Sequence, residues 1–229
     1  MQSTHKGIFI DSYPISFDTE ESQHTTMTFF TTRCELDCYG CHNKTSWERD
    51  PKILQKILTP KKVLEKVIFS REVLGVDMIS LSGGECTLEQ EDIVLYNKMF
   101  YDEGLKVRIE TNGQHPISLF YILENSPVYK VVMDVKISPS MDPVKVLNIL
   151  KGRKIRFEEN EENIRKGLKL KEIYFKHLER SYLFCLKYFC PVSFRTVKYP
   201  LLEENEISEI EEWCKQRKAP WKLNNFIEV

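Results

Sequence analysis

Hydrophobic residues along the chain alternate between short β-branched or aromatic runs and longer runs with helical spacing. The short runs predict six strands, at residues 26–31, 76–81, 106–111, 129–137, 191–198 and 221–227. Thr59 followed by Pro60 is typical of a helix start, and a second helical pattern over residues 89–103 stops at Gly104. A further helix is predicted over residues 202–218, where acidic residues come first and basic residues last.

The repeated order of strand, helix and strand predicts an α/β fold with a parallel sheet and right-handed crossovers, either open or curled into a barrel. Residues 138–190 fit this pattern least. Their part from 151 to 171 is dense in Lys, Arg and Glu, which predicts a charged, solvated insertion that leads into a helix near residues 163–188. The chain has no internal repeat or low-complexity linker, so we expect one domain over residues 1–229, with 1–25 as its N-terminal segment.

Composition narrows the class of protein. A chain of 229 residues with 41% hydrophobic composition can bury a full core. A net charge of -1 offers no field for binding nucleic acid or an anionic membrane. Without a bilayer-length apolar run or a secretory signal pattern, we expect a cytoplasmic protein, in which the seven cysteines are thiols or metal ligands before they are disulfides.

Three of these cysteines form a motif directly after the first predicted strand. Cys34, Cys38 and Cys41 have the spacing C-x3-C-x2-C on what must be a tight loop. Three thiolates cannot complete the four-ligand shell of a structural zinc or of an ordinary iron–sulfur cluster. A metal group bound here therefore keeps one open position, which is where a substrate can bind.

Other distinctive polar residues also lie at the carboxyl ends of predicted strands, the edge where loops converge on ligands in α/β folds. They are Gly83, Gly84, Glu85, Thr111, Asn112, Asp134, Lys136 and Arg195. One pocket could therefore contain them all.

In this order the motifs resemble those of radical S-adenosylmethionine (SAM) enzymes, and specifically the activating enzymes of glycyl-radical proteins. The resemblance includes the cysteine motif with its trailing His42 and Asn43, the Gly-Gly-Glu and Thr-Asn-Gly motifs, and the stretches 134–136 and 194–197. An upstream Asp-Ser-Tyr-Pro at residues 11–14 resembles the entry segment of the anaerobic ribonucleoside-triphosphate reductase activases. The implied fold is a partial (β/α)6 barrel of the radical SAM type.

The resemblance implies a role for each motif. The three cysteines would bind three irons of a [4Fe-4S] cluster and leave the fourth iron to the amino and carboxylate groups of SAM. One electron, from a donor such as flavodoxin or ferredoxin, would then cleave SAM. The resulting 5′-deoxyadenosyl radical would abstract hydrogen from a glycine of a partner enzyme, expected to be an anaerobic ribonucleotide reductase. The protein would thus be an oxidoreductase whose cofactors perform the chemistry.

The expected SAM contacts are distributed over all the strand ends. Gly83 and Gly84 would bring backbone close to the methionyl part, and Glu85 would meet its ammonium. The remaining expected contacts are Thr111, Asn112, Asp134, Lys136, Arg195 and Val197, with Gly40 and His42 near the adenine. Binding of a monovalent cation at Glu110 is left open, because related activases often carry aspartate at this position.

Less specific, structural interpretations of these residues also remain open. The cysteines could bind a structural zinc completed by His42 or Cys86, in a protein that is not an enzyme. Asp134 and Lys136 share one face of a strand and could be a structural ion pair. A radical SAM enzyme that acts on a small molecule, similar to 7-carboxy-7-deazaguanine synthase, is the alternative within the same family.

Overall fold

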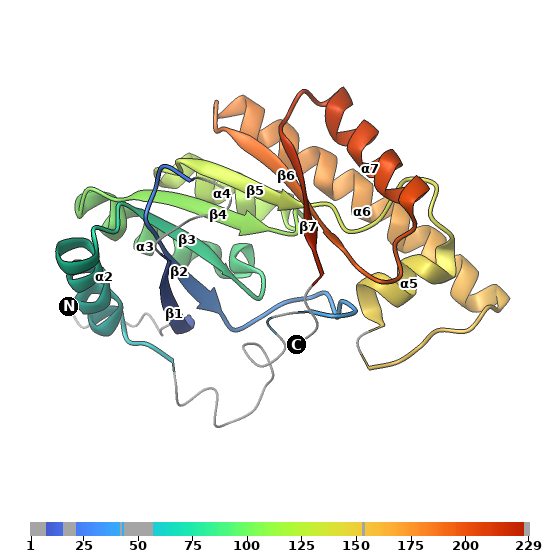
Figure 1. The fold of residues 1–229 in the computed structure, drawn as a ribbon, viewed down its shortest axis with the longest axis horizontal. Coiled ribbons are helices and arrows are strands. Elements are labelled where there is room, and N and C mark those ends of the chain that lie inside the picture. The colour runs from blue at the N-terminus through green and yellow to red at the C-terminus, as the bar shows by residue number, and fades with distance from the viewer. Residues whose placement is uncertain (1–7, 16–21, 42, 44–56, 153, 227–229) are drawn as a thin grey trace.

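The computed structural model describes residues 8–15, 22–41, 43, 57–152 and 154–226. Their sheet has seven strands in the order β1 to β7, each beside the next in sequence (Figure 1). The strands are β1 Phe9–Ile15, β2 Thr26–Thr31, β3 Met78–Gly83, β4 Lys106–Thr111, β5 Lys130–Asp134, β6 Val192–Lys198 and β7 Trp221–Asn225. Strand β1 is antiparallel to β2, and the six strands β2 to β7 are parallel. The α/β class and the six parallel strands of the predicted partial barrel are confirmed.

Helices connect the parallel strands (Figure 1). They are α2 Pro60–Leu74, α3 Gln90–Asp102, α4 Pro116–Asn125, α5 Pro143–Lys151, α6 Glu161–Lys187 and α7 Glu204–Gln216, with a 3-10 turn, η1 Cys86–Glu89, before α3. Helix α2 begins as predicted, because the Thr59 side chain accepts from the Lys62 amide and Pro60 occupies the first turn.

The strands alternate in polarity along their length. Ile79 and Leu81 of β3 are fully buried with other apolar side chains in the layer between sheet and helices. Ser80 and Ser82 alternate with them and belong to the opposite face of the sheet. That face carries charged residues on β4, β5 and β6 as well, so the interior of the partial barrel is polar and holds the site.

The expectation for the 138–190 segment is wrong in part. A solvated insertion was expected over residues 151–171, but α6 begins at Glu161, and α5 precedes it. The sequence did carry a helix-start signal for α5, the pair Asp142-Pro143. In the structure Pro143 occupies the first helical position, and the Asp142 side chain accepts from the amides of Val144 and Lys145. Helix α5 is only nine residues long, and the charged residues that follow it obscured its apolar pattern. The predicted helix near 163–188 is confirmed as α6.

Strand β1 was not predicted, because the N-terminal segment has no clear alternation. The 11–14 stretch noted above lies within it.

Helices α5 and α6 approach each other closely at Gly167. A Cβ at this position would lie 1.9 Å from the carbonyl oxygen of Pro143, which leaves no space for a side chain. Gly167 is therefore a packing requirement of the α5–α6 pair.

Gly167→Ala should lower the free energy of unfolding by about 1–3 kcal/mol, because the added methyl group forces the two helices apart. Without the close contact, alanine in a helix interior would stabilise the protein by about 0.5–1 kcal/mol, so the sign of the change is diagnostic. Urea unfolding would measure it, with exposed Lys169→Ala on the same helix as the control. A stabilised Gly167→Ala variant would contradict the packing described.

Candidate active site

The carboxyl ends of the parallel strands surround a cavity of about 630 Å³. Every predicted site residue lines it except His42, which lies outside the described residues. These lining residues are Cys34, Cys38, Gly40, Cys41, Gly83, Gly84, Glu85, Thr111, Asn112, Asp134, Lys136, Arg195 and Val197. Predicted site residues up to 163 positions apart in sequence, from Cys34 to Val197, thus meet at one place, as expected for the loop edge of a parallel sheet.

The three cysteines lie on the loop after β2. Burial raises the pKa of Cys38 to about 12 and also raises the pKa of Cys34, so both thiols are neutral until a metal displaces their protons. Within the described part of the chain, no three His, Cys, Asp or Glu side chains are close enough to bind one metal ion. Three thiolates can occupy three irons of a [4Fe-4S] cluster and leave the fourth iron open, whereas a structural zinc needs four ligands.

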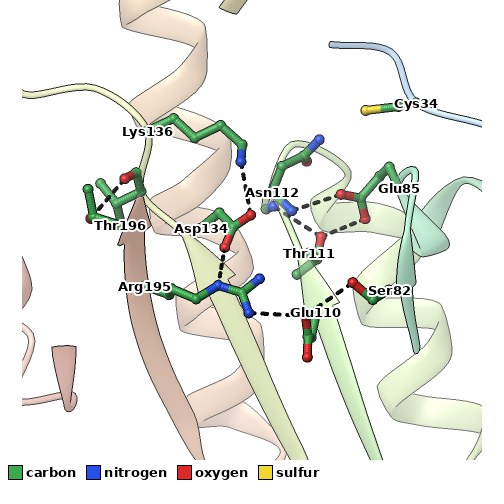
Figure 2. A network of polar contacts seen from close by, with 12 residues as sticks. Cys34, Ser82, Glu85, Glu110, Thr111, Asn112, Asp134, Lys136, Arg195 and Thr196 are labelled. Carbon is green, nitrogen blue, oxygen red and sulfur yellow. Dashed lines mark hydrogen bonds and ion pairs between the residues drawn. The ribbon is translucent and has the colours of Figure 1, made fainter. Parts of the chain in front are cut away.

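Glu85 joins two of the predicted motifs. Its side chain is 1% exposed and accepts hydrogen bonds from the Thr87 amide and hydroxyl at 3.2 and 2.6 Å. It also accepts from the Thr111 hydroxyl and the Asn112 amide, at 2.6 and 2.8 Å (Figure 2). Burial, and then the charge of Glu35, raise the pKa of this carboxyl. Glu85 therefore holds the end of β4 against the end of β3, in addition to the ligand contact expected of it.

A chain of buried ion pairs connects β4, β5 and β6 (Figure 2). Asp134 lies 2.9 Å from the Lys136 ammonium and 2.8 Å from Arg195 Nε. Arg195 also reaches Glu110 at 3.1 Å, and Glu110 accepts from Arg108 at 2.8 Å. The interpretation of Asp134 and Lys136 as an ion pair is therefore correct, and it is compatible with a place at the cavity wall.

These ion pairs keep the acidic and basic groups of the network in their charged forms. Burial would raise the pKa of Asp134, but Arg195 and Lys136 outweigh it and lower the pKa from an ordinary value of 3.8 to about 2. Burial likewise opposes the charge of Lys136, yet Asp134 raises the pKa of this ammonium well above its usual value. Both groups stay ionised at neutral pH, so the cavity wall presents fixed cations.

Helix α6 supports two strand ends, which sequence reasoning missed. The buried Tyr174 hydroxyl donates to the Asp134 carbonyl (3.0 Å) and accepts from the Lys136 amide (2.9 Å). Ser181 of the same helix donates to the Gly113 carbonyl at 2.8 Å. No motif marks these residues, because their role depends on how α6 crosses the sheet.

Several residues in or beside the cavity wall were not among the expected cluster or SAM contacts. Glu35, beside the first cysteine, accepts from the Asn112 side-chain amide at 2.8 Å and pairs with His115 at 3.0 Å. His115 directly precedes α4 and contacts the cysteine loop through this pair. Strand β7 adds several polar side chains to the cavity wall. The additional wall residues are Leu36, Asn43, Ser82, Glu110, Tyr199, Lys222, Leu223, Asn224 and Asn225. The alternation of Lys222 and Asn224 in the predicted last strand was the available signal for the β7 group.

Gly40 stands directly before the third cysteine, where the structure leaves no space for a side chain. Its φ is +59°, and a Cβ would lie 2.4 Å from the ring of Phe226. The Phe226 ring also stacks on Tyr39, with 6.5 Å between centroids. A side chain at position 40 is thus excluded both by the backbone and by this ring.

The radical SAM superfamily matches residues 28–175, so the chain belongs to this superfamily, whose members use a [4Fe-4S] cluster and SAM. The chain is 33% identical over 107 residues to 7-carboxy-7-deazaguanine synthase of Clostridium acetobutylicum, covering 47% of this chain and 45% of that protein. It is 29% identical over 109 residues to a protein of Methanocaldococcus jannaschii provisionally named a glycyl-radical enzyme activating enzyme, covering 47% and 41%. The matched segments thus span less than half of these relatives.

Solved structures support the fold. The structure of QueE from Escherichia coli matches with a TM-score of 0.51 at 12% identity, over 98% of this chain and 99% of that one. None of the helices within the described residues has the length and apolar character needed to cross a bilayer.

Asp134→Asn should lower the free energy of unfolding at pH 7, and part of the loss should depend on pH. The lowered pKa of Asp134 contributes about 2 kcal/mol of stability, present above pH about 4 and lost as the pH falls from about 4 to about 2. The difference in unfolding free energy between wild type and variant should therefore narrow by that amount when urea titrations are repeated from pH 6 downward. A gap that is constant across this range would contradict the ion-pair assignment.

Tyr174→Phe should cost about 1–3 kcal/mol of unfolding free energy, because the buried Lys136 amide loses its acceptor. Tyr101, which is 62% exposed on α3, provides the matched Tyr→Phe control and should show no change. Equal unfolding midpoints for the two variants would show that the Tyr174 hydroxyl does not support this strand end.

Proposed function

We propose that this protein is a radical SAM activase that installs a glycyl radical on a partner enzyme, with anaerobic ribonucleotide reductase as that partner. The observation that carries the proposal is the Cys41-His42-Asn43 ending of the cysteine loop, whose Asn43 side chain donates to the Gly83 carbonyl at 2.8 Å. This contact ties the cysteine loop to the Gly-Gly-Glu motif. The relative in Methanocaldococcus jannaschii supports the same class of activity.

The residues of the chain would hold the cofactors in a defined order around the cavity. Cys34, Cys38 and Cys41 would each bind one iron, and the open iron would take the amino and carboxylate groups of SAM. The fixed cations Lys136 and Arg195 line the same cavity and can donate to the carboxylate and ribose oxygens. Together, cluster and SAM supply a radical able to abstract hydrogen once one electron has been delivered, here by flavodoxin or ferredoxin in the cytoplasm.

The remaining predicted contacts keep their assigned places in this proposal. Backbone at Gly83 and Gly84 faces the methionyl part, with Glu85, Thr111 and Asn112 beside it. Asp134 acts through the cations that it holds, Val197 contacts the adenine side, and Gly40 offers backbone only. A monovalent cation at Glu110 is left out, because Arg108 and Arg195 already neutralise that carboxylate.

A second candidate function is a reaction on a small molecule, favoured by the identity to 7-carboxy-7-deazaguanine synthase. Enzymes similar to that synthase tend to lack the His-Asn pair after the third cysteine. The presence of His42 and Asn43 is the reason to place this candidate second.

The test is anaerobic incubation of the reconstituted protein with SAM, reductant and the reductase, read by electron paramagnetic resonance. We expect a glycyl radical on the reductase with wild type and none with Cys38→Ala. Cys190→Ala removes a buried thiol outside the cavity wall and should retain both iron and activity.

Absence of a glycyl radical, with SAM still cleaved, would overturn the assignment of the partner. Turnover of a pterin substrate without any partner protein would favour the small-molecule candidate instead. Stoichiometric zinc with no iron in the purified protein would support a metal-binding protein that is not an enzyme.

A further inference from the structure

The cysteine loop rests on the carboxyl end of α5. The Asp37 amide donates to the Leu150 carbonyl at 3.0 Å, and the Tyr39 amide donates to the Ile149 carbonyl at 2.9 Å. The two amides flank Cys38, so the backbone is held on both sides of the middle cysteine. Figure 1 shows the loop after β2 extending to α5.

These hydrogen bonds satisfy both the amides of the cysteine loop and the carbonyls at the end of α5. The last carbonyls of a helix have no amide donors within the helix and need donors from elsewhere. A left-handed glycine often closes the helix end, but Gly152, the residue after α5, has a φ of -93°. The amides of the cysteine loop supply donors at this helix end instead.

Lys151 adds a side-chain contact at the same point. Its ammonium donates to the Glu35 carbonyl at 2.5 Å, next to the first cysteine. A cation in the last turn also complements the negative end of the helix dipole. The helix end and Lys151 thus contact the loop at three backbone groups between Cys34 and Cys41.

Helix α5 is itself held firmly. Its Asn148 side chain exchanges two hydrogen bonds with the Phe157 backbone, at 2.8 and 3.1 Å. Lys145 pairs with Glu203 and Glu206 at the start of α7, at 2.8 and 2.7 Å. The close contact at Gly167 described above fixes α5 against α6. The support under the cysteine loop is therefore a rigid part of the fold.

We propose that the carboxyl end of α5 is the positioning element of the cysteine loop, and that Lys151 is a positioning residue which holds the loop in its metal-binding shape before any metal is bound. The inference rests on membership of the superfamily and not on the substrate or partner proposed above. It gives a function to α5, which lies in the 138–190 segment that fitted the sequence pattern least.

The test compares four forms of the metal-free protein: wild type, Lys151→Met, Lys151→Arg and the control Lys169→Met, an exposed lysine of α6. Hydrogen exchange of individual amides is followed by nuclear magnetic resonance. In Lys151→Met, we expect the Asp37 and Tyr39 amides to exchange about tenfold faster, because a hydrogen bond from a charged donor to the loop is lost. Lys151→Arg should restore slow exchange, and amides of the sheet core should be unchanged in every form.

A second measurement follows the loaded protein without using its activity. After cluster reconstitution, a chelator should remove iron faster from Lys151→Met than from wild type, Lys151→Arg or the control. Wild-type exchange rates at Asp37 and Tyr39 in Lys151→Met would overturn the proposal, as would equal iron loss from all four forms. Neither result depends on whether the partner is a glycyl-radical enzyme.

Discussion

The site depends on the neutralisation of charges that are buried at the carboxyl ends of β4, β5 and β6. Glu110 and Asp134 are each shared between two cations, so Arg108, Arg195 and Lys136 form one chain with them. Removing one member of such a chain leaves a buried charge without its partner, at a cost of about 3–5 kcal/mol. The network therefore holds three strand ends in register while it supplies cations to the cavity wall.

A second layer of contacts supports this wall from outside. Helix α6 fixes the ends of β4 and β5 through Ser181 and Tyr174, and α5 holds the cysteine loop. The two helices in turn meet at Gly167. The metal-binding loop and the cavity wall are thus supported by one helix pair, which joins sequence segments more than 100 residues apart, as between Glu35 and Lys151.

The sequence was sufficient for features that depend on local pattern. The six parallel strands follow from β-branched and aromatic runs, and the convergence of the motifs follows from the geometry of parallel sheets. Tyr174, Glu35 and Lys151 could not be assigned in this way, because their contacts depend on tertiary packing. Helix α5 was missed for a different reason: its apolar face is short and the residues after it are highly charged.

The glycine at position 40 has a physical reason that sequence alone could not provide. The backbone there is left-handed, and the Phe226 ring occupies the space of a side chain. This ring comes from the segment after β7, so its contact with the cysteine loop depends on tertiary packing.

The cysteine loop and the strand ends surround one cavity, in which a cluster held by the three cysteines would bind SAM at its open iron. The most direct test is the electron paramagnetic resonance spectrum of the reduced, reconstituted protein, recorded with and without SAM. We expect a [4Fe-4S] signal whose g-values shift when SAM is added. A signal that SAM leaves unchanged, or a protein that binds no iron, would contradict it.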